Sequence, residues 1–562
     1  MLAQWARSAI LFKNKKILIA SLVFFFSFLW IVILVQGLPV GCLDEWAMTS
    51  IAQQTSWSDF GKHLVLPWSQ SAYWFNQVAF YDQVCLKRIV HGILLKFTQS
   101  LFGLHSFPYF LITKVFFFCG IVTLVFLFMT YVTGSLGLSL AGAVFFLLIP
   151  AHYCHVLWIA DPYTIAIFFV TLSMWFFYKF VSALDKGEPL RNLFPWIAGL
   201  FVAGWFGIKT KEPALIFPVV AGAYLLIYCR HWKGRGKVVL SVLFLLVLIA
   251  FQIVPIEHLN APVQRLGYHV SSITRFLFRN YQVGADNEPT TAFFSLEALW
   301  PVSIARTFGF FSLWGIILFA LIHGAGRIFR RSSTPSFFSD PLIRFSAVWV
   351  GIEILLVGFF QPEPRFFTSI MIPLSLLSVR LVSCVLNSWQ GFVRKILTLA
   401  AIFCWVWSAF YLNFQQVITT RIVTGMRNNR LFETARVIYS DIHKDKSPSI
   451  SDVATFYCPA YALKKIVRPR IDDVVFFADN LYVQCWNKTE DGSLDDFKRF
   501  AKTGAVYYVT TDPKKFSGFP DATLVGKVTG INEGSKFEVL RYLKKKKKPA
   551  IERVYKYTGT PQ

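Results

Sequence analysis

Long apolar stretches alternate with short basic segments along most of this chain. The first apolar stretch covers residues 17–36, and crossing a bilayer takes roughly 20 residues. Counting the later stretches of similar length predicts about 11 transmembrane helices. The later predicted spans are residues 107–132, 136–151, 161–181, 193–207, 213–229, 238–256, 304–325, 343–360, 366–386 and 395–415.

The composition supports a polytopic membrane protein. Charged residues make up 15% of the chain and hydrophobic residues 55%, whereas soluble domains carry roughly 25% charged residues. The formal net charge of +25 does not require a nucleic-acid partner, because much of it lies in basic clusters between apolar stretches. The first stretch is too long for the apolar core of a signal peptide and lacks a small-residue cleavage site, so no cleavage is expected.

The basic clusters predict the orientation. With a cytoplasmic N-terminus, five clusters fall on the cytoplasmic side, as the positive-inside rule requires. They are Lys13/Lys15/Lys16, Lys186/Arg191, Arg230/Lys233/Arg235/Lys237, Arg327/Arg330/Arg331/Arg344 and Arg394/Lys395. The outer side then receives Asp44/Glu45, the loops 152–161, 209–212, 257–300 and 361–365, and everything after about Thr420.

Two domains are predicted, a transmembrane domain over residues 1–420 and a small extracytoplasmic α/β domain over residues 421–562. Predicted strands cover residues 452–457, 473–477, 505–509, 522–528 and 536–542, and a capped helix covers residues 493–500. Alternating strands and helices are typical of an α/β domain. No glycine-rich phosphate loop follows a strand, so nucleotide binding is not expected. The five lysines 544–548 predict a solvated tail, with anionic lipid headgroups as the alternative partner.

The outer loop after the first span carries the adjacent acids Asp44 and Glu45. Neighbouring side chains point in different directions, which favours one acting carboxylate over a shared-proton pair. A carboxylate with a pKa of about 4 becomes a stronger base through burial or a nearby like charge. The alternative is that both acids face water at a helix start. Further along, residues 86–103 mix apolar and charged positions and predict a helix lying on the membrane surface.

A second outer loop holds His152, His155 and Asp161. Two histidines and an acid could ligate a metal, but an interfacial position is the favoured interpretation of the histidines. Asp161 precedes Pro162, a pattern typical of a helix start with an N-capping side chain. Its remaining oxygen could still point toward a site.

Basic residues mark two further outer loops. Lys209 and Lys211 separate two apolar stretches, and Arg365 follows Glu363 at the start of a span. Ammonium groups at the mouth of a membrane cavity suit a phosphate, and a guanidinium can bind two phosphate oxygens. The alternatives are snorkelling to headgroups and ordinary interfacial anchoring.

Cysteines on the outer side could form two disulfides. Cys42 and Cys85 share the first outer loop, and Cys458 and Cys485 share the outer domain, where the compartment is oxidising. A disulfide requires closely spaced Cα atoms, and the sequence leaves both pairings open.

Several segments together resemble the GT-C superfamily of integral membrane glycosyltransferases, which includes the aminoarabinose transferases and the protein O-mannosyltransferases. Asp44–Glu45 is similar to the acidic motif of the family's first outer loop, and Asp161 after Pro150 to its second acid. The other similar segments are residues 101–107, residues 207–212, and Pro364-Arg365-Phe366-Phe367 followed by Pro373. They span most of residues 17–415. Phe366 stands where the family more commonly has Tyr, and the sequence around Asp44 lacks the mannosyltransferases' histidine-bearing pattern.

The resemblance implies transfer of a sugar from a polyprenyl-phosphate donor, the co-substrate, to a glycolipid, polysaccharide or protein acceptor, with inversion. It implies a multi-pass protein of a bacterial inner membrane. The implied catalytic residues are Asp44 as the base, Glu45 as its helper, and Asp161. The implied donor phosphate-binding residues are Lys209, Lys211 and Arg365. A divalent metal, Mg²⁺ or Mn²⁺, held by Asp44 and Asp161 would add to the charge stabilisation. The residues expected to line the substrate-binding site are Trp68, Tyr73, Trp74, Tyr81 and Glu363.

Two other classes of function remain open. A transporter or flippase for lipid-linked sugars would also need polar residues at span ends, but such proteins commonly show internal repeats and midplane sites. No repeat is visible here, and the acids noted above lie in outer loops. A catalytically silent assembly partner would fit the same pattern, because a fold does not guarantee an activity.

Overall fold

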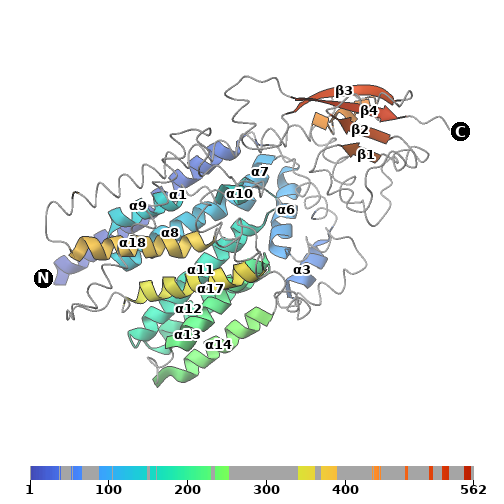
Figure 1. Ribbon diagram of the computed structural model, residues 1–562. Helices are drawn as coiled ribbons and strands as arrows, with labels where there is room; N and C mark the ends of the chain where they lie inside the picture. The colour runs from blue at the N-terminus through green and yellow to red at the C-terminus, as the bar shows by residue number, and fades with distance from the viewer. Residues whose placement is uncertain are drawn as a thin grey trace.

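The computed structural model describes a helical bundle and a small sheet (Figure 1). It describes residues 2–36, 38, 52, 55–65, 88–103, 106–147, 152–157, 159, 161–228, 234–251, 340–360, 369–388 and 396, parts of 433–444, and four strands between 475 and 557. The sheet lies beside the end of the bundle that carries the short helices.

Long helices form the bundle. They are α1 (Leu2–Val35), α8 (Phe116–Thr133), α9 (Leu136–Leu147), α11 (Tyr163–Asp185), α12 (Leu190–Ile208), α13 (Ile216–Tyr228), α14 (Gly236–Phe251), α17 (Pro341–Phe360) and α18 (Met371–Ser388). Shorter elements cluster at the sheet end. These are α3 (Trp57–Val65), α6 (Ile89–Phe102), α7 (Ser106–Phe110), the π-helical turn η1 (Leu111–Val115), α10 (Tyr153–Val156) and the 3₁₀ turn η3 (Glu212–Leu215).

Most predicted spans coincide with these helices. The main difference is α1, which begins at Leu2 and not near residue 17. The predicted spans 304–325 and, apart from Ile396, 395–415 lie outside the described residues. A helix forms where the membrane-surface helix was predicted, as α6, which lies across the bundle end beside α7 (Figure 1). Its position on the membrane surface stays a prediction.

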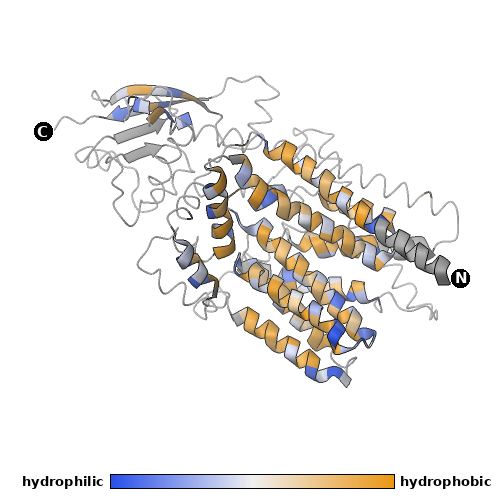
Figure 2. Ribbon diagram, turned by 180° about the vertical axis from the view of Figure 1, so that it is seen from behind, coloured by the Kyte–Doolittle hydropathy of each residue, from blue (hydrophilic) through white to orange (hydrophobic). Residues whose placement is uncertain are grey.

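Within the described part of the chain, three helical segments are long and apolar enough to cross a membrane: Lys15–Val35, Phe107–Thr133 and Tyr163–Asp185. The other apolar helices are shorter. Figure 2 shows that hydrophobic residues dominate the long helices. The total of about 11 spans stays a prediction.

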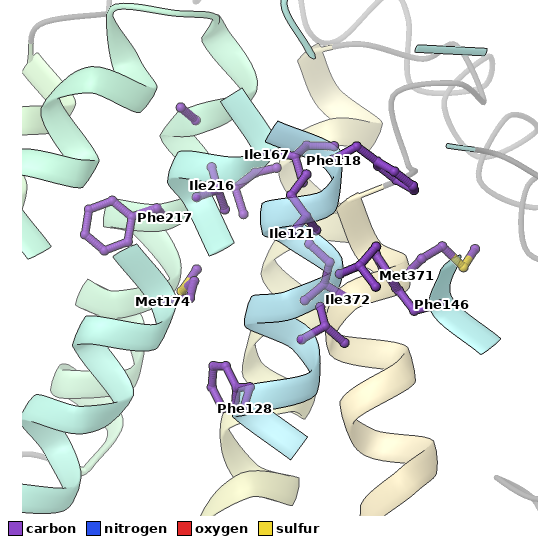
Figure 3. Close-up of a cluster of buried hydrophobic side chains, with 14 of the residues drawn as sticks. Phe118, Ile121, Phe128, Phe146, Ile167, Met174, Ile216, Phe217, Met371 and Ile372 are labelled. Atoms are coloured by element: carbon purple, nitrogen blue, oxygen red, sulfur yellow. The ribbon is translucent and has the colours of Figure 1, made fainter. Parts of the chain in front are cut away.

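Aromatic and small residues allow the bundle to pack closely. The Phe345 ring of α17 contacts Phe128 of α8, Phe177 of α11 and Tyr224 of α13, with ring centroids about 6 Å apart. A Cβ on Gly142 of α9 would lie 2.5 Å from a Met129 atom, so glycine is what permits this approach. Figure 3 shows the apolar side chains of α8, α11 and α18 gathered in the interior.

Asp340, which precedes α17, stabilises the end of the bundle that lies away from the sheet. Its Oδ1 accepts hydrogen bonds from the backbone N–H groups of Leu342 and Ile343, at 3.0 and 3.2 Å. Its Oδ2 accepts two from the Arg380 guanidinium of α18, at 2.8 and 2.5 Å. One side chain therefore caps α17 and joins it to α18.

The sheet has the strand order β1-β2-β4-β3. The strands are β1 (Val475–Ala478), β2 (Val506–Thr510), β3 (Ala522–Gly530) and β4 (Ala550–Tyr557). β1 and β2 are parallel, and β4 runs antiparallel to both of its neighbours. Parallel neighbours need a crossover connection, which fits the predicted α/β domain.

The sheet confirms some predictions and corrects one. The strands predicted at 473–477, 505–509 and 522–528 form as β1, β2 and β3. The lysines 544–548 were predicted to be a tail, but the chain returns after them as β4, an inner strand of the sheet. The strand itself reads Ala-Ile-Glu-Arg-Val-Tyr-Lys-Tyr, which carries three charged side chains and lacks a strict alternation of apolar positions. The predicted strands 452–457 and 536–542, and the helix 493–500, lie outside the described residues, and the division at residue 420 stays a prediction.

Replacing Asp340 separates its two roles. Asp340→Asn keeps an oxygen for the cap and loses the charge pair, whereas Asp340→Ala loses both. We expect Asp340→Ala to lower the free energy of unfolding by about 2 kcal/mol and Asp340→Asn to lower it by less. Thermal unfolding of the purified protein in detergent measures this ranking. Equal melting temperatures for both variants and the wild type would contradict it.

Candidate functional site

Asp161 is the centre of a buried polar cluster at the sheet end of the bundle. Its side chain is 4% exposed. Oδ1 accepts the Tyr163 backbone N–H at 3.0 Å. The N-cap of α11 is Pro162 and not the predicted Asp161, which bonds the first N–H of the helix from one position earlier. Oδ1 also accepts a hydrogen bond from Lys211 Nζ at 2.8 Å. Oδ2 lies 2.5 Å from His155 Nδ1, so both carboxylate oxygens have partners.

Lys211 reaches Asp161 from the turn between α12 and α13. Its backbone is extended just before η3, and its ammonium lies 5.4 Å from the centroid of the Tyr163 ring. The segment 209–212 was predicted to lie on the same side of the membrane as Asp161, and the structure brings the two segments into direct contact. Lys211 thus forms a buried ion pair with Asp161.

Lys209 occupies a different place in the same turn. Its carbonyl accepts the Val90 N–H of α6 at 3.3 Å, which fixes α6 against the end of α12. Its ammonium lies 5.1 Å from the centroid of the Trp205 ring, a distance at which a cation is attracted to the ring face. The two predicted phosphate-binding lysines therefore have different aromatic neighbours.

Lys114 belongs to the cluster although the sequence interpretation missed it. It lies in the π-helical turn η1, is fully buried, and donates a hydrogen bond from Nζ to the Asp161 carbonyl oxygen. Such π-helical turns are frequent at functional sites. The sequence does carry a signal, since Lys114 is a lone cation in an otherwise apolar span, and intramembrane charges are costly and usually functional.

Both histidines are buried inside the end of the bundle, and their position at the membrane interface stays a prediction. His155 is 2% exposed, bonds to Asp161, and stacks on the Tyr163 ring with centroids 4.2 Å apart. His152 is buried between Phe118 and Phe146. The Tyr153 hydroxyl accepts a hydrogen bond from Trp30 of α1 and donates one to the Leu147 carbonyl. These two hydrogen bonds fix the loop against the bundle.

A third histidine, His91 of α6, also joins this end of the bundle. Its Nε2 lies 2.9 Å from the carbonyl oxygen of Ile159, so α6 is tied to the segment that leads to Asp161. Among the described residues, no three His, Cys, Asp or Glu side chains form a group that could hold a metal. The predicted metal pair of Asp44 and Asp161 stays a prediction, because Asp44 lies outside the described residues.

Electrostatics keep Asp161 ionised. Burial alone would raise the pKa of this carboxyl, but the Lys211 charge and the hydrogen-bonded His155, with help from Lys114, hold it well below its usual value. Burial lowers the pKa of Lys209 to about 8. Burial and the neighbouring His155 lower the pKa of His152 to about 3, so His152 is neutral at physiological pH.

The cluster combines one carboxylate with two buried ammonium groups, those of Lys114 in η1 and Lys211 in the turn before η3, and Lys209 is buried in that same turn beside Trp205. Lys114, Lys209 and Lys211 are at most 5% exposed. Ammonium groups held in a low-dielectric environment bind anions strongly, so this end of the bundle is suited to an anionic substrate such as a phosphate.

The other predicted site residues lie outside the described residues and stay predictions. They are Asp44, Glu45, Trp68, Tyr73, Trp74, Tyr81, Glu363 and Arg365, together with the cysteine pairs Cys42/Cys85 and Cys458/Cys485.

Comparisons with known proteins give only a weak likeness. No protein-family model and no curated protein matches the chain. Two similar solved structures are crystal structures of ArnT from Cupriavidus metallidurans. The one bound to undecaprenyl phosphate has 12% identity and a TM-score of 0.46, over 98% of this chain and 99% of that one. The one in the apo state has 11% identity and a TM-score of 0.44, over 99% and 100%. TM-scores below 0.5 do not establish a common fold.

The buried pair predicts a coupled loss of stability. Asp161→Asn leaves Lys211 buried without its carboxylate and should cost about 3 kcal/mol of unfolding free energy. The double variant Asp161→Asn/Lys211→Met removes both charges, so its cost should be smaller than the sum of the two single costs. Thermal unfolding of the purified variants measures this.

The exposed pair Asp59–Lys62 of α3, 3.8 Å apart, supplies the control. Asp59→Asn should leave the melting temperature unchanged, because exposed ion pairs contribute little. Strictly additive losses at Asp161 and Lys211 would show that the buried pair does not couple the two segments.

Proposed function

We propose that the chain is a membrane glycosyltransferase of the GT-C type. It moves a sugar from a polyprenyl-phosphate donor to an extracytoplasmic glycolipid, polysaccharide or protein, with inversion at the anomeric carbon. The observation that carries this proposal is the buried Lys211–Asp161 pair. It joins two segments, 50 positions apart, each of which resembles a motif of that superfamily.

The reaction needs a base on one side of the sugar and cations on the other. The acceptor hydroxyl oxygen attacks the anomeric carbon, its proton passes to the base, and the bond from that carbon to the phosphate oxygen breaks. Asp44 is the proposed base, with Glu45 as its helper. The leaving phosphate needs charge stabilisation, which Lys209, Lys211 and Arg365 would supply.

Asp161 acts in this scheme by holding the cations. It is ionised, and its two oxygens already accept from Lys211, His155 and the Tyr163 N–H. Its carboxylate holds the Lys211 ammonium in one position. The conformational entropy of orienting this side chain is therefore lost on folding and not during the reaction. Asp161 is therefore a positioning residue for Lys211.

A divalent metal at Asp161 does not fit the described contacts. Mg²⁺ or Mn²⁺ would need carboxylate oxygens, and both oxygens of Asp161 are engaged by protein donors. A metal here would share these oxygens with the Lys211 ammonium, whose positive charge 2.8 Å from Oδ1 disfavours a second cation, so no step of the proposed reaction passes through one.

The transporter alternative fits the cluster less well. Transporter sites commonly lie near the middle of the bilayer, whereas Asp161 precedes the first residue of α11 and Lys209 follows the last residue of α12. A silent assembly partner would not need buried ammonium groups held around a carboxylate.

The function is tested by sugar transfer in membranes from a labelled polyprenyl-phosphate donor, comparing the wild type with Asp44→Asn. We expect the variant to lose at least 100-fold in transfer rate, because removing a general base typically costs 10²–10⁴-fold. Expression and donor binding should stay normal. Equal transfer by both proteins would remove Asp44 from the mechanism, and no transfer from any donor by the wild type would overturn the proposed function.

The pKa of Lys209 predicts a pH dependence. Its ammonium is charged below pH 8 and loses the proton as the pH rises through about 8, so donor binding should weaken by about tenfold between pH 7 and 9.5. Lys209→Arg stays charged over this range and should bind the donor equally at both pH values. Titrating donor binding measures this, with Lys186→Arg as the control. Identical pH profiles for the wild type and Lys209→Arg would rule out a role for the Lys209 charge.

A further inference from the structure

A chain of hydrogen bonds leads from Tyr163, beside Asp161, to a carboxyl group inside α17. The Tyr163 hydroxyl lies 3.0 Å from Ser369 Oγ, just before α18. Ser369 donates to Oε1 of Glu353. The three residues are at most 2% exposed, so these hydrogen bonds are screened from water. They link α11, α17 and α18.

The donor and the acceptor of each hydrogen bond in this series follow from counting the hydroxyl protons. The Ser369 hydroxyl has one proton, which it donates to Glu353, so its oxygen accepts the proton of the Tyr163 hydroxyl. Glu353 is therefore the final acceptor that orients both hydroxyls. A residue with no acceptor at position 353 would free Ser369 to rotate, and the phenol would lose its defined partner.

The ring of Tyr163 contacts both groups that hold Asp161. The His155 ring stacks on it at 4.2 Å and 23°, and the Lys211 ammonium lies 5.4 Å from its centroid. The Tyr163 backbone N–H also bonds to Asp161. A change in the tilt of this ring would therefore displace His155 and Lys211 relative to the carboxylate.

We propose that Glu353 is a positioning residue of the site, acting through Ser369 and Tyr163 on the Lys211–Asp161–His155 cluster. Glu353 does not contact that cluster directly within the described part of the chain. The proposal rests on the proposed function only in taking Lys211 and Asp161 as site residues.

The chemistry of α17 gives independent support. Glu353 is the single acidic residue between Pro341 and Phe360 and is fully buried. A carboxyl in an apolar helix is costly, and a well-packed apolar side chain is often at least as stabilising as a buried polar group. Its presence is explained if orienting Ser369 and Tyr163 is its task.

The first test measures the reactivity of Lys211 and needs no substrate. Purified full-length protein in detergent is treated briefly with acetic anhydride, and acetylation of Lys211 is quantified by mass spectrometry. We expect Glu353→Leu and Tyr163→Phe each to raise the rate about threefold or more, because a looser pair with Asp161 leaves the amine free for longer. Glu353→Gln retains an acceptor oxygen and should match the wild type.

Matched controls separate positioning from general loosening. Ser378→Ala also removes a buried hydroxyl from the α18 region, but this hydroxyl bonds within its own helix, to the Leu374 carbonyl. It should not change Lys211 acetylation, and the exposed Lys186 should react equally in all variants. An unchanged Lys211 rate in Glu353→Leu, or an equal rise in Ser378→Ala, overturns the proposal.

The second test uses transfer from the labelled polyprenyl-phosphate donor. We expect Glu353→Leu to lower kcat about tenfold or more, since a small misplacement of a site residue is costly, with a smaller change in KM and rescue by Glu353→Gln. The double variant Glu353→Leu/Tyr163→Phe should be no slower than the slower single variant. Independent, multiplying losses would sink the proposal. If the wild type transfers nothing, the proposed function fails while the acetylation result still decides the role of Glu353.

Discussion

The need to keep a charged carboxylate inside an apolar bundle shapes the end of the molecule where the site lies. Asp161 is ionised and buried, and an isolated charge there would be prohibitively costly. Four groups compensate it: Lys211 from the turn before η3, His155 from α10, Lys114 from η1 and the first N–H of α11. The turns and short helices at this end are thus arranged around one negative charge.

Hydrogen bonds to the loops around Asp161 also fix the short elements at this end of the long helices. Two of the bonds that hold α6 reach these loops, one from Val90 to the Lys209 carbonyl and one between His91 and the Ile159 carbonyl. Both partners lie within two residues of a cluster member, Lys211 or Asp161. α6 therefore fixes the two loops that meet at the candidate site. The aromatic contacts of Phe345 join α17 to α8 and α11.

Sequence reasoning predicted the helices well and the site only in part. Hydrophobic length alone placed the continuous span from α7 to α8, and also α9, α11 and α12, within a few residues. It also singled out Asp161 and Lys211, which the structure pairs, since charges at span ends stand out. It missed Lys114 and Glu353, whose signal is a single charge inside an apolar span. It did not predict the burial of His155 against Tyr163, because this stacking depends on how two segments fold together, which no local pattern contains.

The π-helical turn η1 has a consequence for the geometry of the whole span from α7 to α8. A π turn carries one more residue than the α-helical turn it replaces, and each residue of an α-helix advances the helical phase by about 100°. The extra residue at Leu111–Val115 therefore resets the phase between α7 and α8. α7 and α8 present different sides to their surroundings than one uninterrupted α-helix would, and the lysine at this phase shift, Lys114, donates to the Asp161 carbonyl.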